Sequence, residues 1–313
     1  MSSIAFTFPG QGSQAVGMGK ALYDASAAAR AVFHEVDEAL GQKLSALMFE
    51  GPEDELTLTA NAQPALMAVS MAAMAMLSER GVSVDKAAYV AGHSLGEYSA
   101  LCAAGTFSLS DTAKLLRIRG NAMQAAVPVG AGAMAAIIGA EADAVAKLCA
   151  DSAGGEICQI ANDNGGGQLV ISGSAAAIAR AIEGAAAMGA KRAIPLSVSA
   201  PFHSALMQPA ADAMRAALAD VAKHAPRVPV IANVTVSALT DPEAIAASLV
   251  AQVTGQVRWR ETVEWFAANN ITTLYEIGSG KVLTGLAKRI SKEISGVAVN
   301  TPEDIEALAQ TLA

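Results

Sequence analysis

The chain has 313 residues, of which 53% are hydrophobic and 16% charged, and its formal net charge at pH 7 is −8. This length allows one large domain or two smaller ones with an extensive core. The acidic balance argues against nucleic-acid binding, which requires a basic surface. No purely apolar stretch reaches the roughly 18 residues that span a bilayer, so we expect no membrane-spanning helix and no membrane association.

The N-terminus and the cysteines indicate a cytoplasmic protein. Residues 1–4 lack the basic region and the cleavage site of a secretory signal. The three cysteines, Cys102, Cys149 and Cys158, form no Cys-x-x-Cys pair, so neither a disulfide framework nor a zinc site is expected. We therefore expect a cytoplasmic location, no bound metal and no bound cofactor.

A glycine-rich loop follows the first predicted strand, which spans residues 4–8 and ends at Pro9. The loop, Gly10 to Gln14, precedes a helix predicted from about residue 17 to residue 40. It loosely fits a dinucleotide-binding fingerprint, but residues 41–58 contain no clear second strand ending in an acidic residue, so we reject that interpretation. Two interpretations remain: a plain tight turn, or a loop that directs backbone N–H groups and the Gln11 amide into a pocket.

The most informative segment follows a helix predicted from Pro64 to Ser78. An apolar strand at 87–91 and a helix at 95–104 are joined only by Gly92-His93-Ser94. This is the pattern of a nucleophile elbow, in which glycines at both sides let the helix fold back over the strand and leave Ser94 exposed at the tip. The five-residue pattern can arise by chance, but this strand–turn–helix context is the one that it requires.

Two neighbours of Ser94 are candidates for holding a negative oxygen. The backbone N–H of Leu95 lies at the predicted helix N-terminus, where free donors and the helix dipole favour an anion. His93 either donates a hydrogen bond near that oxygen or fixes the turn.

Arg119 shares the apolar stripe of the next predicted helix, which is capped by Ser110 and runs to about Ala126. An inward-pointing arginine keeps its proton and must meet an anion or several carbonyl groups. No acidic residue occupies this helix face. We hypothesise that the partner is a carboxylate of the substrate, and the alternative is a structural arginine bonded to loop carbonyls.

The order of predicted helices and strands changes over residues 129–199. Strands are predicted at 131–139, 156–161, 168–173 and 190–199, and helices at 141–151 and 174–189. This β-α-β-β-α-β order is that of a ferredoxin-like unit, here a small inserted subdomain. Between its middle strands, Asn162 and Asn164 either line a cleft or shape a hairpin turn.

His203 follows Pro201-Phe202 where the insert ends. Of the other histidines, His34 and His224 lie in charged amphipathic helices. His203 is placed to reach Ser94 across a cleft as a general base, although a lone histidine is also compatible with a structural role. No Asp or Glu stands out as a third member of a triad, and Gln252 is the candidate that orients the histidine.

The remaining elements complete an α/β fold. Helices are predicted at 203–223, 242–253, 258–269 and 281–294, strands at 228–232, 272–277 and 296–299, and a helix at the end. Gly278-Ser279-Gly280-Lys281 lacks two required P-loop positions, so a P-loop is rejected. We predict an α/β-hydrolase-like catalytic subdomain with a parallel sheet, built from residues 1–128 and 200–313, with the ferredoxin-like subdomain at 129–199 inserted.

The ordered set of motifs resembles that of the malonyl-CoA:acyl carrier protein transacylases, acyltransferases of fatty-acid and polyketide synthesis. The set comprises Phe8 to Gln14, Gly92 to Glu97, Arg119 placed 25 residues after Ser94, and Pro201 to Ser204. The resemblance spans nearly the whole chain, and the motifs are specific jointly rather than singly.

The resemblance implies a role for each matching residue. Ser94 is the implied nucleophile, His203 the base, and Arg119 the group that binds the malonyl carboxylate. The backbone N–H groups of Gln11 and Leu95 are the implied oxyanion hole, and the main-chain carbonyl of Gln252 is the implied orienter of His203.

The activity so implied is a ping-pong transfer of a malonyl group from malonyl-CoA to the phosphopantetheine thiol of acyl carrier protein, for fatty-acid synthesis. Phe202 is similar to the malonyl-type form of its motif, since its bulk would crowd a branched acyl group. The alternatives are an acyltransferase that serves a polyketide synthase, a serine thioesterase or esterase, and a non-catalytic docking subunit. We expect a monomer.

An acidic carrier protein needs a basic surface on this acidic chain. The best cluster is formed by Lys281, Lys288, Arg289 and Lys292 at helical spacing, with Arg258 and Arg260 as further candidates. The alternative is an ordinary solvated helix face.

Overall fold

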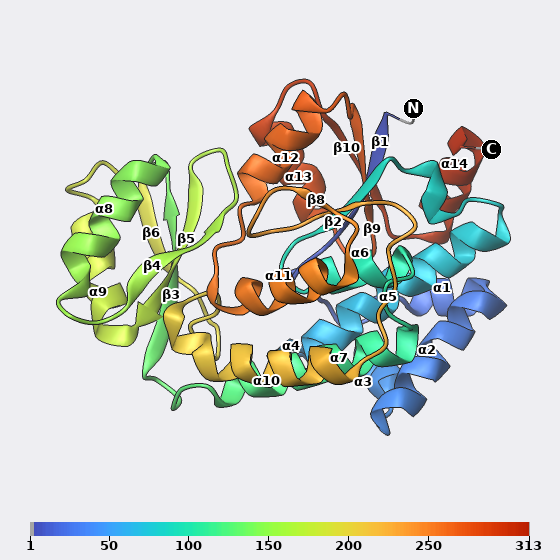
Figure 1. Ribbon diagram of the computed structural model, residues 1–313, viewed down its shortest axis with the longest axis horizontal. Helices are drawn as coiled ribbons and strands as arrows, with labels where there is room; N and C mark the ends of the chain where they lie inside the picture. Colours follow the sequence, from blue (N-terminus) through green and yellow to red (C-terminus); the bar gives the residue numbers. More distant parts are fainter. Residues whose placement is uncertain (1–2, 313) are drawn as a thin grey trace.

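The larger part of the molecule is built on a mostly parallel sheet of six strands (Figure 1). The structure, a computed structural model, describes residues 3–312. The strand order is β10-β9-β1-β2-β7-β8, and all neighbours are parallel except β7 and β8. The strands are β1 Ile4–Phe8, β2 Tyr89–Gly92, β7 Val230–Ile231, β8 Ala238–Leu239, β9 Thr273–Ile277 and β10 Ser295–Val299.

Helices cover both faces of this sheet, as burial of a parallel sheet requires. On one face, Phe6 and Phe8 of β1 pack into the main core, and on the other, Ala5 packs against Trp259 and Phe266. The helices are α1 Lys20–Ala25, α2 Ala27–Leu40, α3 Leu44–Glu50, α4 Glu53–Thr57, α5 Thr59–Glu79, α6 Gly96–Ala103, α7 Leu109–Ala125, α10 Gln208–Asp220, α11 Pro242–Thr254, α12 Trp259–Ala268, α13 Val282–Ile290 and α14 Pro302–Leu312. Short 3₁₀ turns lie at Val84–Lys86 and Ala205–Met207.

Helix α5 is the central helix of the main core and contacts α2, α6 and α7. Among residues 3–312 it is the one helix that is long and apolar enough, by length and composition alone, to cross a membrane. However, 83% of its most apolar window is buried inside the protein. Its uniform apolarity is therefore accounted for by packing on all sides.

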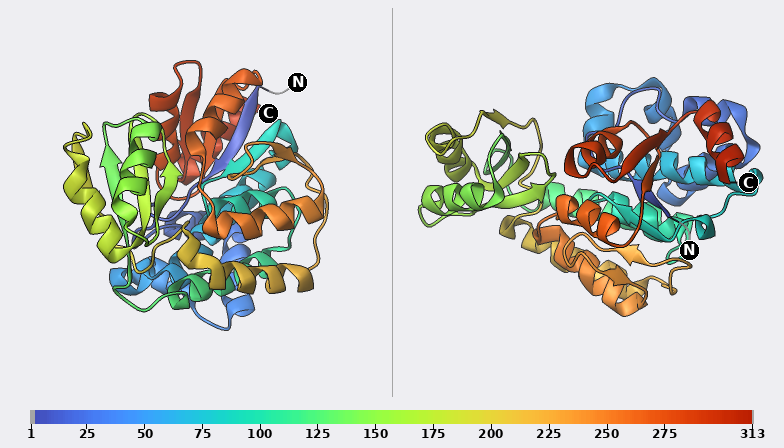
Figure 2. Two further views of the ribbon diagram at one scale, coloured as in Figure 1. Left: turned by 60° about the vertical axis from the view of Figure 1, so that its left-hand side comes forward. Right: turned by 90° about the horizontal axis from the view of Figure 1, so that it is seen from above.

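A second, antiparallel sheet stands beside the first, in the order β4-β5-β3-β6 (Figures 1 and 2). Its elements are β3 Gly132–Ile138, α8 Ala142–Ala153, β4 Cys158–Asp163, β5 Gln168–Ser174, α9 Ala175–Ala185 and β6 Arg192–Pro195. The predicted ferredoxin-like order is thus confirmed. All six elements fall inside 129–199, although the exact domain boundaries stay a prediction.

Several predicted boundaries near the N-terminus are wrong. The helix predicted at 17–40 is two helices, because Ser26 is extended and its hydroxyl caps α2 by accepting from Ala29 N. Helix α5 begins at Thr59, so Pro64 lies inside it rather than at its start. The cap of α7 is Ser108, which accepts from Asp111 N, not Ser110.

The segment at the junction with the second sheet also differs from the prediction. The strand predicted at 190–199 is shorter and ends at Pro195. The helix predicted from His203 begins only at Gln208. Residues 196–207 are therefore mostly irregular backbone, and His203 lies in this irregular segment rather than in a helix or strand.

Candidate active site

Ser94 occupies a sharp turn between β2 and α6. Its φ is 54°, in the left-handed region that non-glycine residues rarely adopt. A Cβ at Gly92 would lie 1.9 Å from the backbone of Gly96, and one at Gly96 would lie 2.2 Å from Phe8 O. Only glycine fits at both positions, which explains how the turn leaves Ser94 at its tip.

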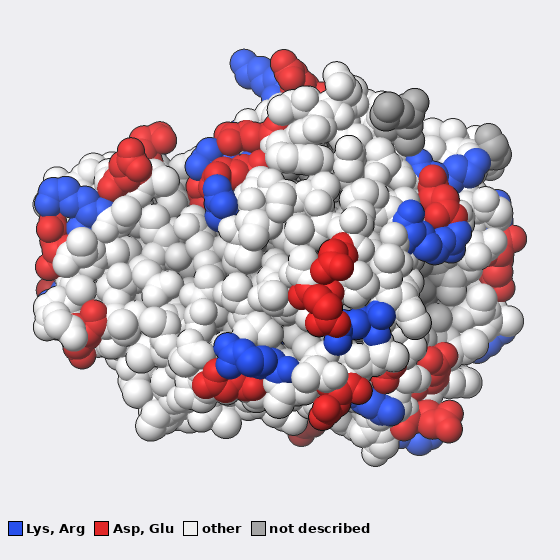
Figure 3. Space-filling model, in the orientation of Figure 1, with Lys and Arg blue, Asp and Glu red and all other residues white. Residues whose placement is uncertain are grey.

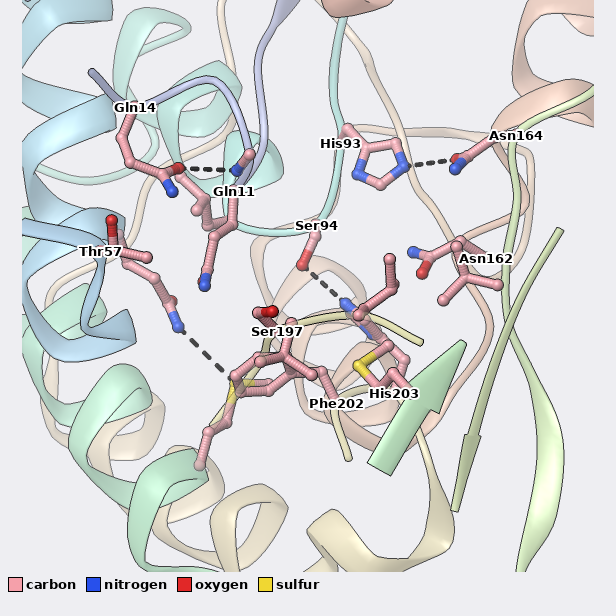
Figure 4. Close-up of a pocket in the computed structure, with 18 of the residues that line it drawn as sticks. Gln11, Gln14, Thr57, His93, Ser94, Asn162, Asn164, Ser197, Phe202 and His203 are labelled. Carbon is pink, nitrogen blue, oxygen red and sulfur yellow. Dashed lines mark hydrogen bonds between the residues drawn. The ribbon is translucent and has the colours of Figure 1, made fainter. Parts of the chain in front are cut away.

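His203 hydrogen-bonds Ser94 across the cleft, with 2.7 Å between Nε2 and Oγ (Figure 4). Its Nδ1 lies 2.9 Å from the main-chain oxygen of Gln252 and 3.2 Å from that of Gly255. A carbonyl oxygen only accepts, so Nδ1 carries the proton and Nε2 is the acceptor for the serine hydroxyl. Two carbonyls therefore orient His203 where a triad would use a carboxylate.

Arg119 lies beside Ser94 and is only 1% exposed. Its Nη2 donates to Ser94 Oγ at 3.2 Å and to Gln252 Oε1 at 2.9 Å, and its Nη1 donates to Gln63 Oε1 at 2.8 Å. Burial lowers the pKa of Arg119. The guanidinium is thus a buried positive charge held by two amide carbonyls.

Glu97 of α6 is the acidic residue linked to Arg119 through Gln252, and the sequence did not indicate this role. Its Oε2 accepts from Gln252 Nε2 at 2.9 Å and from Asn233 N at 3.0 Å. Burial raises the pKa of Glu97 to about 7. The expectation that no acidic residue lies on the face of Arg119 is correct for α7 itself. The carboxylate of Glu97 in α6, however, is separated from Arg119 only by the side-chain amide of Gln252.

Three further residues of the network were missed: Gln63, Thr59 and Asn233. Asn233 Oδ1 accepts from Ser94 N at 2.8 Å, and its Nδ2 donates to Gly92 O at 2.7 Å, so it holds both sides of the elbow. Asn233 lies two residues after the end of the short strand β7. Its position near the carboxyl end of a parallel strand is the signal by which sequence could have indicated it. Gln63 is a buried glutamine in an apolar helix. Such a residue indicates a polar network, since a buried amide requires hydrogen-bond partners.

A cleft of about 330 Å³ lies between the two sheets and opens onto Ser94. Figure 4 shows Gln11, Ser94, Phe202 and His203 around it. Its apolar wall comes from both parts of the chain and consists of Met123, Met134, Val170, Leu196, Val198 and Phe202. Gln252 does not line the cleft and acts from behind Arg119.

The two predicted oxyanion-hole residues, Gln11 and Leu95, both line the cleft. Within residues 3–312, neither backbone N–H donates to a protein acceptor. Leu95 is the N-cap of α6, so its donor has the favourable field of a helix N-terminus. The cleft therefore brings together the Ser94 hydroxyl, the His203 imidazole and two available backbone donors.

His93 joins the elbow to the second sheet. Its Nε2 lies 2.9 Å from Asn164 Oδ1, and its ring is 5.6 Å from that of Trp259 between centroids. Burial lowers the pKa of His93. Asn162 lines the cleft with Asn164 and forms an isolated bridge with Val257, so both asparagines face the cavity.

The predicted basic cluster is only partly as expected. Lys281 precedes α13 and Lys292 follows it, so only Lys288 and Arg289 lie in its last turn. These four side chains are exposed, and none pairs with a carboxylate of residues 3–312. On the face shown in Figure 3, basic and acidic side chains are mixed.

Arg258 and Arg260 do not belong to a free basic surface. Arg258 pairs with Glu261, and Arg260 pairs with Asp163 at 2.8 Å and Glu264 at 2.9 Å. Their charges are locally compensated, so they add little free positive charge to the cluster.

The acyl transferase domain family matches residues 5–302 of the chain. The chain belongs to this acyltransferase family. Among curated acyltransferases, the malonyl CoA-acyl carrier protein transacylase of Bacillus subtilis is 48% identical over 100% of this chain and 98% of its own length. That of Escherichia coli is 45% identical over 98% of this chain and 99% of its own length.

Solved structures of acyltransferases agree with the fold. The acyl-carrier-protein S-malonyltransferase of Bartonella henselae has a TM-score of 0.97 and 64% identity, with 99% of each chain covered. A malonyl-transacylase solved in complex with a type II polyketide-synthase acyl carrier protein has a TM-score of 0.95 and 43% identity, covering 98% of this chain and 99% of that one.

We expect His203 to make stability depend on pH. Burial and the Arg119 charge lower its pKa from 6.5 to about 3, so between these values the unfolded chain binds a proton that the folded protein does not. Stability is therefore lost as pH falls below 6.5, by up to about 1.4 kcal/mol per pH unit. Urea unfolding at pH 4 to 8 should show this loss in the wild type relative to His203→Asn, which keeps a residue suited to the positive φ. Parallel curves for the two proteins contradict the prediction.

Proposed function

We propose that this protein transfers the malonyl group of malonyl-CoA to the phosphopantetheine thiol of acyl carrier protein, supplying malonyl units for fatty-acid synthesis. The observation that carries the proposal is the buried Arg119 guanidinium, with Nη2 3.2 Å from Ser94 Oγ. A permanent positive charge at this distance favours an acyl group that ends in a carboxylate. The names of the relatives support the same substrates.

In the first half-reaction, Ser94 Oγ attacks the thioester carbonyl carbon while His203 Nε2 takes the hydroxyl proton. The N–H groups of Gln11 and Leu95 donate to the oxyanion of the tetrahedral intermediate. The carbon–sulfur bond then breaks, and the CoA sulfur leaves with the proton from His203. The product is a malonyl ester of Ser94.

The second half-reaction runs the same steps with a new thiol. His203 takes the proton of the phosphopantetheine thiol, the sulfur attacks the ester carbonyl, and Ser94 leaves as an alkoxide that regains the proton. Each half-reaction returns the base to its starting state. The exchange therefore needs no metal or redox cofactor, and we propose that none is used.

The substrate carboxylate also prepares the base. Arg119 is one of the causes that lower the pKa of His203. A carboxylate bound to Arg119 offsets that charge, so the imidazole becomes more basic when malonyl-CoA is in place. The arginine thus discriminates between acyl groups both by binding and by its effect on the base.

The fit to a small acyl group comes from the apolar wall of the cleft. Phe202 precedes the base, is 9% exposed, and would crowd an α-methyl branch. One methyl group changes discrimination by only about 1–3 kcal/mol, so this is a preference rather than an exclusion. We further propose a monomer that works in the cytoplasm without nucleic acid or membrane.

We propose that Lys281, Lys288, Arg289 and Lys292 form the docking surface for the acidic carrier protein. Arg289 also contacts the second sheet through Gln168 Oε1, so Lys288 is the cleaner position to test. We expect Lys288→Glu to raise the KM for carrier protein several-fold and to leave malonyl transfer to free CoA thiol unchanged. Lys114→Glu, an exposed lysine on α7, is the control, and equal KM values for both variants would remove this surface from consideration.

The test of the proposed function is the intact mass of the protein after mixing with malonyl-CoA and no thiol acceptor. We expect a stable gain of one malonyl group in the wild type and none in Ser94→Ala, because the ester forms on the Ser94 oxygen. Carrier protein should then discharge the adduct. Rapid release of free malonate without a retained adduct would assign the protein as a hydrolase instead.

Arg119→Ala should separate charged from uncharged acyl donors. We expect the rate with malonyl-CoA to fall about a hundredfold or more and the rate with acetyl-CoA to fall much less, since both donors lose the support that Arg119 gives to Gln63 and Gln252 but only malonate has a carboxylate to lose. Steady-state kcat/KM for both donors measures this, with Arg117→Ala as the control because Arg117 bonds Asn61 and Gln42 outside the cleft. Equal losses with the two donors would be incompatible with carboxylate recognition.

A further inference from the structure

A line of hydrogen bonds runs from Arg119 to the loop that carries Gln11. Arg119 Nη1 donates to Gln63 Oε1, Gln63 Nε2 donates to Thr59 Oγ1, and Thr59 Oγ1 donates to Gln11 Oε1, each at 2.8 Å. Thr59 is fully buried, and Gln63 and Arg119 are each 1% exposed. Water therefore has no access to replace the inner bonds of this line.

The direction of donation along this line is fixed by chemistry. A guanidinium only donates, so Gln63 must present its oxygen to Arg119 and its NH₂ to Thr59. The NH₂ group only donates as well, so the Thr59 oxygen accepts from it. The single hydroxyl proton of Thr59 is then left for Gln11 Oε1. The permanent charge of Arg119 thus sets the orientation of every group up to Gln11.

Gln11 has little other support. It lies in the irregular loop between β1 and α1 and is exposed. The bond from Thr59 is the only hydrogen bond to Gln11 among residues 3–312. Thr59 itself is firmly placed, because Gly120 of α7 packs closely on it: a Cβ at Gly120 would lie 2.8 Å from Thr59 O and 2.6 Å from Ala60 Cα.

We propose that Thr59 is a positioning residue, which holds Gln11 so that its backbone N–H faces the reacting carbonyl. This inference rests on the proposed function, since the roles of Gln11 and Arg119 belong to it. The hydroxyl ties the side chain of Gln11 to α5, and the loop backbone follows the side chain. Gln252 makes the corresponding connection on the other side of Arg119, because its Nε2 donates to Ser94 O at 2.9 Å, next to Leu95.

Thr59 is expected to affect a different step from Arg119. A misplaced oxyanion donor weakens binding of the transition state and not of the substrate, so kcat falls while KM changes little. The oxyanion is common to all acyl groups. The loss from a Thr59 variant should therefore be equal for malonyl-CoA and acetyl-CoA, whereas the loss from Arg119→Ala depends on the carboxylate.

The experiment compares Thr59→Val, which removes the hydroxyl at similar volume, with Thr59→Ser, which keeps it. We expect kcat for both acyl donors to fall about tenfold or more in Thr59→Val, with KM changed less than twofold, and Thr59→Ser to restore kcat. Thr59→Ala serves as a second hydroxyl-free variant should Thr59→Val fold poorly. Thr112→Val is the control, because Thr112 is an equally buried threonine whose hydroxyl donates to Ser108 O and which does not line the cleft.

A double-mutant cycle with Gln11→Ala distinguishes positioning from a structural role. Gln11→Ala keeps the backbone N–H and removes the side chain on which Thr59 acts. We expect Thr59→Val to change kcat less than twofold in that background. The same loss of kcat in both backgrounds would overturn the inference, and so would wild-type kcat in Thr59→Val.

Malonylation of the wild-type protein distinguishes failure of this inference from failure of the proposed function. If the wild type forms no malonyl ester on Ser94, the proposed function is wrong and this inference is wrong with it. If the wild type is malonylated and Thr59→Val matches it in rate, only the role of Thr59 is overturned.

Discussion

The buried charge of Arg119 is the constraint on which the rest of the site depends. A guanidinium out of contact with water is costly, and it cannot escape the cost by losing its proton. The chain meets part of this cost with the oxygens of Gln63 and Gln252, which come from α5 and α11 and accept from the two Nη atoms. The orientation of both amides is then fixed, so the positions of α5, α7 and α11 are tied to one another beside Ser94.

The elbow depends on the same groups. Ser94 is in a strained backbone conformation, which persists only where its surroundings over-determine it. Asn233 binds Ser94 N and Gly92 O, and Gln252 Nε2 binds Ser94 O. The turn is therefore held on both sides by residues that also reach Glu97 or Arg119, Asn233 through its backbone N–H and Gln252 through its side chain. A change at Arg119, Gln252 or Glu97 is therefore expected to shift Ser94.

The sequence predicted the parts of the site that local rules specify. The elbow has fixed spacing, and Arg119 stands out as a charge on an apolar stripe, so both could be found without partners. Gln63, Thr59 and Asn233 were missed because their partners lie far along the chain, as in the 139 residues between Ser94 and Asn233. A single polar residue carries no signal of which distant group satisfies it. The start of α5 was misplaced for a related reason, since packing of Gly120 against residues 59 and 60 favours a helix there in spite of Pro64.

The use of amides rather than a carboxylate next to Arg119 follows from the proposed reaction. A carboxylate in direct contact would satisfy the guanidinium in a low-dielectric site and would compete with the malonyl carboxylate for it. Amide oxygens fix the geometry of the guanidinium and leave its charge in place. Glu97 is kept one amide away, where it polarises Gln252 towards Arg119 without occupying the position next to Ser94. The site can thus hold a buried cation in place before the substrate arrives and still offer that cation to the substrate.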